Sequence, residues 1–203
     1  MVTRATRPGA AWALWVVVSV IGGVLGALVA WRVRELLTVP APAFVGDVLR
    51  YIATIVSAAI AAGAQWLLLR RYRLDVYWWV PATVTAALLT AIVVIPSVLR
   101  LAADPVASVH PSDPVIAGGA ALAAAGLVIG VAQAIVLRAS VGDKAWLWIP
   151  ATAIGGGLAG ALTSALSSQL IGFSTFAFIS LLGAVGAFLI SACQAPVVAR
   201  LLR

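Results

Sequence analysis

Charged side chains are scarce in this 203-residue sequence: they make up 9% of the residues, whereas hydrophobic residues make up 64%. A soluble globular domain has about 25% charged residues, so this chain has too little charge to cover the surface of a soluble fold of its length. The mean hydropathy of +1.13 leads to the same conclusion. The composition therefore predicts an integral membrane protein whose outer surface faces lipid.

Residue types that carry metal, redox or nucleophilic chemistry are also few. The single histidine, His110, lies in a polar loop, and the single cysteine, Cys193, lies in an apolar run. These counts exclude paired-histidine haem ligation, a histidine-rich metal site and a disulfide within the chain. The sequence has no G-x-S-x-G motif, no Walker motif and no lysine or carboxylate inside an apolar run. We therefore expect no enzyme, no cofactor and no coupling through intramembrane carboxylates.

Six apolar runs are each long enough to cross a bilayer as a helix, which takes about 20 residues. All six acidic residues lie between these runs, and no segment alternates between apolar and polar residues as a transmembrane β-barrel would. The sequence therefore predicts an all-α fold: one integral membrane domain over residues 1–203, a bundle of six transmembrane helices. The runs are Ala10–Trp31, Leu49–Leu69, Val76–Leu99, Val115–Leu137, Ala145–Leu166 and Phe173–Val198.

The distribution of basic residues predicts the orientation. With the N-terminus inside, nine of the 13 basic residues lie on the inner side and four on the outer side, as the positive-inside rule requires. We therefore expect both termini in the cytoplasm, in a bacterial-type inner membrane. Tryptophans near the inner ends of the runs predict an interfacial aromatic belt: Trp12, Trp15, Trp66, Trp78, Trp79, Trp146 and Trp148.

The apolar runs are related to one another in sequence. The second, fourth and sixth end in a glutamine followed by an arginine (Gln65 and Arg70, Gln133 and Arg138, Gln194 and Arg200). The first, third and fifth begin with a tryptophan and continue to a serine or threonine (Trp15 and Ser19, Trp79 and Thr83, Trp148 and Thr152). We therefore expect three tandem helical hairpins over residues 10–70, 76–138 and 145–200.

These residues carry a resemblance to a known kind of protein. The stretch Gly63–Trp66 with Arg70, followed by Trp79–Thr83, resembles uncharacterised bacterial multi-pass membrane proteins with such hairpins in tandem. The similarity extends over most of the chain, but Pro196 interrupts the interval after Gln194, and no tryptophan follows that glutamine. The resemblance implies a membrane location and a helical bundle, and it implies no activity.

Small residues lie where helices would pack in lipid. Hydrophobic burial cannot drive association between helices there, so close packing and interhelical hydrogen bonds take its place. The positions three and seven residues before each repeated glutamine are all small: Ala62 and Ala58, Gly130 and Gly126, Ser191 and Ala187. Three G-x-x-x-G motifs add sites of close approach: Gly22 with Gly26, Gly126 with Gly130, and Gly156 with Gly160.

The three glutamines have two interpretations. Gln65, Gln133 and Gln194 could form a ring of amides around a central solute path, since each amide offers a donor and an acceptor. They could instead join helices, with Thr83 or Thr152 as partners across a hairpin. A typical interhelical hydrogen bond in a membrane contributes about 0.6 kcal/mol. We expect the second interpretation, in which glycine substitutions do more damage than glutamine substitutions.

Two functions fit these observations. The first is a structural or accessory membrane protein that packs against lipids, partner subunits or copies of itself, and it explains the short loops and the missing chemistry. The second is a small permease or substrate-binding membrane component for a neutral or amphipathic solute. We favour the first, because no motif marks the second. Basic residues are scattered rather than clustered, so nucleic acid is not expected as a partner. Polar side chains that face one shared interior would favour the permease.

Overall fold

The computed structural model describes residues 8–35, 43–72, 74–103, 113–169 and 174–201 of the chain. The predicted all-α character is confirmed: the described residues form helices joined by short turns. The helices are α1 (Pro8–Glu35), α2 (Ala43–Arg71), α3 (Trp79–Leu89), the π-helix η1 (Thr90–Val94), α4 (Ile95–Ala103), α5 (Pro114–Val141), the 3-10 helix η2 (Gly142–Leu147), α6 (Trp148–Gln169) and α7 (Thr175–Leu201).

The predicted number of six separate membrane-spanning helices is wrong. The described residues contain five continuous helical segments that are long and apolar enough to cross a membrane: Ala10–Val33, Val45–Arg71, Trp79–Leu101, Pro114–Ser167 and Thr175–Leu201. The fourth segment, of 54 residues, joins two predicted helices. It is continuous because residues 138–144, expected to be a loop, are helical: α5 extends to Val141, and η2 begins at Gly142.

The chain reverses its direction within this long segment. Gly142 ends α5 with a φ of 64°, and its N–H donates to the carbonyl oxygen of Arg138. A positive φ is readily adopted only by glycine, which explains the residue found at this position. Gly118 and Gly126 of α5 then lie against Ser164 and Thr152 of α6, so the two helices run antiparallel.

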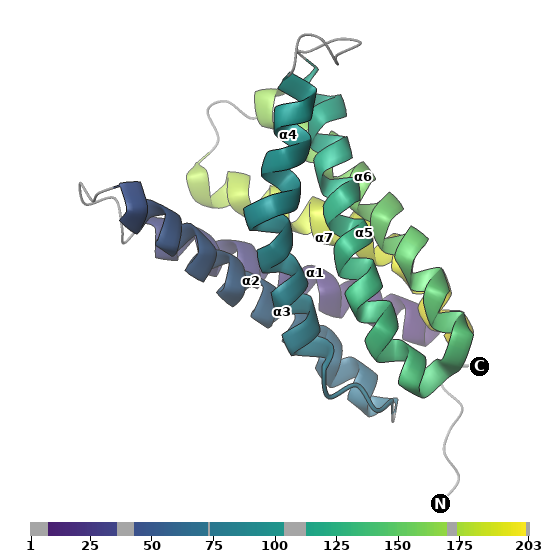
Figure 1. Ribbon diagram of the computed structural model, residues 1–203. Coiled ribbons are helices and arrows are strands. Elements are labelled where there is room, and N and C mark those ends of the chain that lie inside the picture. The colour runs from purple at the N-terminus through teal and green to yellow at the C-terminus, as the bar shows by residue number, and fades with distance from the viewer. Residues whose placement is uncertain (1–7, 36–42, 73, 104–112, 170–173, 202–203) are drawn as a thin grey trace, which may run out of the picture.

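The helices form a ring in chain order (Figure 1). Helix α1 packs on α2, α2 on α3, α3 and α4 on α5, α5 on α6, α6 on α7, and α7 returns to α1. Helices α1, α3 and α6 begin at one end of this ring, which we call the tryptophan end, and α2, α5 and α7 end there. Figure 1 shows the opposite end spread apart, with the start of α2 far from α4. Helices α2 and α4 therefore diverge away from the tryptophan end (Figure 1).

The rod made by α3, η1 and α4 contains a local irregularity before Pro96. The N–H of Ile95 donates to the carbonyl of Thr90, five residues earlier instead of four. Pro96 has no N–H and its ring would clash with the carbonyl four residues before it, so a wider turn accommodates it. The rod begins at Trp79, later than the predicted Val76, because the N–H of Trp79 and the carbonyl of Val76 close a turn.

Many large apolar side chains face outward, and several polar side chains are buried. Leu67, Ile135 and Ile154 are each more than half exposed in the isolated chain. The buried polar side chains include Thr83, Gln133 and their counterparts on other helices. This arrangement inverts that of a soluble protein and suits a lipid solvent, in which exposed leucine or isoleucine carries no penalty.

Candidate functional site: a chamber lined by amides above three tryptophans

Three tryptophans form a closed layer at the tryptophan end. Trp79 and Trp148 are the first residues of α3 and α6, Trp15 lies in the second turn of α1, and all three are fully buried. Their ring centroids lie 6.5 Å (Trp15 to Trp79), 5.3 Å (Trp15 to Trp148) and 5.7 Å (Trp79 to Trp148) apart, with edge-to-face geometry in each pair. Such pairs are favourable because the positive edge of one ring meets the negative face of the next. We call this layer the tryptophan floor.

The prediction that these tryptophans belong to an interfacial belt is wrong for Trp15, Trp79 and Trp148, which lie in the core. Trp12, Trp78 and Trp146 are exposed. A signal in the sequence separates the two groups: each buried tryptophan is followed four residues later by a serine or threonine, and none of the other inner-end tryptophans is. In a helix that spacing places the hydroxyl directly above the indole.

Each repeated glutamine bonds one of these hydroxyls. The Nε2 atoms of Gln65, Gln133 and Gln194 donate to Ser19 Oγ at 3.2 Å, Thr83 Oγ1 at 3.0 Å and Thr152 Oγ1 at 3.0 Å, respectively. The threonine hydroxyls in turn donate to the backbone carbonyls of the floor tryptophans: Thr83 to Trp79 at 2.8 Å and Thr152 to Trp148 at 2.9 Å. The amides of Gln133 and Gln194 are thereby held at a fixed height above the floor.

The amide oxygens of Gln133 and Gln194 differ in their hydrogen bonds: the first accepts one and the second accepts none. The indole Nε1 of Trp148 donates to Gln133 Oε1 at 2.7 Å. Within the described residues, Gln194 Oε1 and the Nε1 atoms of Trp15 and Trp79 are buried without a hydrogen-bond partner. Buried polar groups are almost always paired, so each exception calls for an explanation.

The three amides line one cavity of about 230 Å³ on the far side of the tryptophan floor. Its walls come from α2, α3, α5, α6 and α7, and they are otherwise apolar or small. The five residues singled out in the sequence all line it: Gln65, Gln133, Gln194, Thr83 and Thr152. We call this cavity the chamber.

A second cavity of about 340 Å³ adjoins the chamber. The two share Ala61, Gln65, Leu122 and Ile190 in their walls. The second cavity continues between α1, α6 and α7, away from the floor, past Gly23 and Gly183. No Asp, Glu, Lys or Arg is among the described residues that line either cavity. The ring is therefore hollow beyond the floor, with a wall that is neutral throughout.

Small residues make room for the chamber by bringing helices together around it. A Cβ on Gly126 would lie 2.5 Å from the carbonyl oxygen of Thr152, and one on Gly130 would lie 3.1 Å from Ile149 Cα. A Cβ on Gly156 would press on the carbonyl of Leu122. The backbones of α5 and α6 are thus in direct contact on this side of the chamber.

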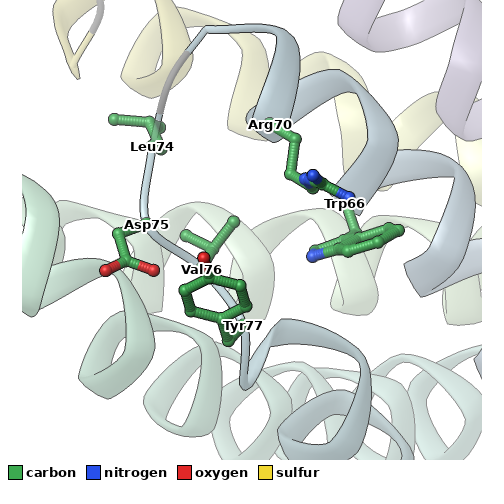
Figure 2. Close-up of a pocket in the computed structure, with 6 residues that line it drawn as sticks. All are labelled: Trp66, Arg70, Leu74, Asp75, Val76 and Tyr77. Atoms are coloured by element: carbon green, nitrogen blue, oxygen red, sulfur yellow. The ribbon is translucent and has the colours of Figure 1, made fainter.

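A separate pocket lies on the surface at the α2–α3 connection, and no pattern in the sequence indicates it. Figure 2 shows Arg70 beside Trp66 on α2, with the segment that carries Asp75 and Tyr77 facing them. The guanidinium of Arg70 lies 4.7 Å from the centroid of the Trp66 ring. The pocket has a volume of about 230 Å³ and is completed by Leu74 and Val76.

Comparison with known proteins adds no further information about either site. No protein family, no curated protein and no solved structure matches this chain.

Proposed function

We propose that this protein is a small permease, or the substrate-binding membrane component of one, for a neutral or amphipathic solute. The observation that carries the proposal is the shared chamber, into which three helices each bring an amide. Amides that only joined pairs of helices would have no reason to face one hollow. This is the arrangement that, on sequence grounds, favours a solute path over a purely structural role.

The chamber indicates the class of solute. Its wall offers amide and hydroxyl groups on an apolar background and no charge, so a charged solute would lose its hydration without gaining a counter-charge. An apolar cavity of about 150 Å³ holds benzene, and the chamber, at about 230 Å³, accepts a somewhat larger molecule. The solute we propose is about the size of a substituted six-membered ring and carries a hydroxyl or an amide.

The same proposal includes six membrane crossings arranged as three tandem hairpins. The segment Pro114–Ser167, at 54 residues, would measure about 81 Å as a straight helix, far more than the roughly 30 Å hydrocarbon core. It therefore crosses twice, with η2 as its turn. The recurrence of one tryptophan, one hydroxyl and one glutamine in each hairpin supports the tandem arrangement.

We place the tryptophan end in the cytoplasm, on the basis of the bias in basic residues. The tryptophan floor then closes the chamber on the inner side, and the second cavity extends toward the outside. Cysteine labelling in a Cys193→Ala background tests this orientation. Cysteine at Tyr77 should react only from the cytoplasmic side, and cysteine at His110, which lies outside the described residues, only from the outer side. The opposite pattern would reverse the orientation.

Ligand-dependent stabilisation tests the solute class. The purified protein in lipid nanodiscs is heated with benzamide or with benzoate, two probes of equal shape that differ in charge. A bound solute stabilises a protein by about 2.7 kcal/mol at a concentration of 100 Kd. We expect benzamide to raise the Tm and benzoate to leave it unchanged, since the chamber has no cation to receive a carboxylate.

A chamber-filling variant provides the control for this test. Ala58 lines the chamber, and Ala58→Phe should abolish the stabilisation. Ala13 is exposed on α1, and Ala13→Phe adds the same group to the lipid-facing surface and should retain the effect. Equal stabilisation of both variants would show that the probe acts elsewhere. No response of the wild type to benzamide, glycerol or other neutral probes would count against the proposal itself.

One observation favours the structural or accessory function as the second candidate. All three glutamine Nε2 atoms already bond a hydroxyl of the same hairpin, as amides that join helices would. A structural protein would be identified by a stoichiometric membrane partner that co-purifies with the wild type and with Ala58→Phe alike.

A further inference from the structure

Two hollows lie close together on the outer surface around the start of α3. The first is the pocket at the α2–α3 connection, lined by Arg70 and Trp66 on the α2 side and by the segment of Asp75 on the other, with the Asp75 carboxylate directed away from Arg70 (Figure 2). The second is a groove of about 550 Å³ between α3 and α5. Tyr77 lines the pocket, and the next residue, Trp78, lines the groove. Neither hollow opens on the chamber residues, so they call for a separate explanation.

The pocket presents one positive and one negative side chain. Within the described residues, neither Arg70 nor Asp75 forms an ion pair, although three ion pairs form elsewhere. Arg70 is instead stacked on Trp66. Arginine binds phosphate through charge-assisted hydrogen bonds, and a carboxylate flanked by aromatic rings receives an ammonium group. The pocket is thus complementary to a group that carries both charges.

The walls of the pocket are fixed by the core. Val76 is 2% exposed, and the N–H groups of Tyr72 and Leu74 both donate to the carbonyl of Leu69, at 3.0 and 3.3 Å. The carbonyl of Asp75 accepts a hydrogen bond from Ser140 Oγ of α5 at 2.9 Å. The segment that carries the carboxylate is therefore held in place before any ligand arrives, which lowers the entropy lost on binding.

The groove is apolar and has the length of one lipid leaflet. Along α3 it runs from Trp78 to Leu89, and along α5 from Val136 to Val128. At 1.5 Å per residue, the α3 side spans about 16 Å, which matches half of the roughly 30 Å hydrocarbon core. It starts at Trp78, which is 71% exposed beside Tyr77, 75% exposed. Exposed aromatic rings of this kind mark the level of the lipid headgroups.

We propose that this surface holds one phospholipid whose headgroup carries both a phosphodiester and an ammonium. The phosphodiester binds Arg70, the ammonium binds Asp75, and one acyl chain lies in the groove between α3 and α5. The pocket supplies the opposite charges and the groove supplies the apolar length. The inference does not depend on the proposed function, because it involves no residue of the chamber.

Native mass spectrometry of the protein, purified with equal amounts of phosphatidylethanolamine and phosphatidylglycerol, tests the proposal. We expect the protein to retain one phosphatidylethanolamine, in preference to phosphatidylglycerol, as the collision energy that strips off the detergent is raised. Arg70→Gln and Asp75→Asn should each lower this retention about tenfold, as expected for the loss of one hydrogen bond between charged groups. Thr85→Trp, which fills the groove from an exposed position, should lower it as well.

Matched variants separate a specific site from the general lipid annulus. Arg138 is also stacked on a tryptophan, Trp146, at 5.5 Å, but it pairs with Asp143 at 3.4 Å, so Arg138→Gln removes the same charge from an arginine that already has a partner and should leave retention unchanged. Ile154→Trp, on an exposed face of α6, is the control for the groove. Equal loss with Arg70→Gln and Arg138→Gln would overturn the proposal. A loss with Arg70→Gln but not with Asp75→Asn would overturn the assignment of an ammonium headgroup.

Discussion

The two sides of the ring use the same pair of residues differently. On the α5–α6 side, the indole of Trp148 donates to the amide oxygen of Gln133 at 2.7 Å. On the α1–α7 side, Trp15 and Gln194 offer the same donor and the same acceptor, and within the described residues neither atom has a partner. The hydrogen bond between tryptophan and glutamine is thus formed on the α5–α6 side and not formed on the α1–α7 side.

The closest contacts between the helices also differ on the two sides. Helices α5 and α6 touch through backbone at Gly126, whose Cβ position lies 2.5 Å from the carbonyl of Thr152. Helices α1 and α7 meet at Gly183, whose Cβ position lies 3.0 Å from the Cβ of Ala27. The hydrogen bond between tryptophan and glutamine is thus formed on the side where a glycine brings the two backbones into direct contact.

The largest effect is expected from Gly126→Leu. A leucine there would collide with the backbone of α6 and force apart the closest helix pair, at a cost of at least about 3 kcal/mol. Thermal unfolding followed by size-exclusion chromatography measures the loss. Gly63→Leu is the matched control on α2, because a Cβ on Gly63 meets nothing within 4 Å. Equal loss of folded protein in both variants would contradict the role of backbone contact.

A smaller difference is expected between phenylalanine substitutions in the tryptophan floor. Trp148→Phe leaves Gln133 Oε1 buried and unpaired, which costs about 1–3 kcal/mol beyond the loss of ring size. Trp15→Phe and Trp79→Phe remove the same ring atoms but also remove an unpaired N–H, so they should cost less. Measurement of the free energy of unfolding should show the largest loss for Trp148→Phe. Three equal values would mean that the 2.7 Å bond contributes nothing.

Substitutions of the glutamines should also lower the free energy of unfolding more on the α5–α6 side than on the α1–α7 side. Gln133→Leu breaks bonds to both Thr83 and Trp148, whereas Gln194→Leu breaks the single bond to Thr152 and removes an unpaired oxygen. We expect a loss of about 0.6 kcal/mol for Gln194→Leu, the average for one such bond, and a clearly larger loss for Gln133→Leu. Under the proposed function both variants lose the response to benzamide. Retention of that response by both would remove the amides from the solute site.

The smallest effect is expected at Ser19. Its bond with Gln65 is the longest of the three, at 3.2 Å, and lies in a partly exposed region. Ser19→Ala should therefore lower the free energy of unfolding by less than about 0.6 kcal/mol. A loss equal to that of Thr83→Ala, measured in the same lipid, would show that the longer Ser19–Gln65 bond contributes as much as the Thr83–Gln133 bond.

The helices and the residues of the chamber could be predicted from the sequence, because both depend on local pattern. Apolar length predicted the helical segments, and the rarity of glutamine in apolar runs directed attention to Gln65, Gln133 and Gln194. The stretch with Gly142 and charged neighbours predicted a loop between the fourth and fifth segments. The structure instead joins α5 and α6 through a short 3-10 helix, so that the helical residues are continuous although the chain reverses its direction there.

The chamber, the tryptophan floor and the surface pocket could not be predicted in the same way. Each depends on which helix faces meet, and the sequence of a single helix does not contain that information. Trp15 and Trp12 both lie near the start of one apolar run, yet one is buried and the other is 42% exposed. The pocket beside Arg70 depends on the path of a short connection, which is fixed by a distant hydroxyl, that of Ser140.

The contact between α1 and α7 closes the ring, so that the first and last helices are neighbours like any other consecutive pair. Each helix packs on the next, and α7 packs on α1, so the neighbours of a helix stay the same wherever the ring is cut. Joining the end of α7 to the start of α1 and opening the chain between α2 and α3 would return every helix to the same place and the same direction. Chain termini that lie close together are what allows such permutation in domains generally. The linear order of the helices therefore fixes their order around the ring, but not the point at which the ring is cut.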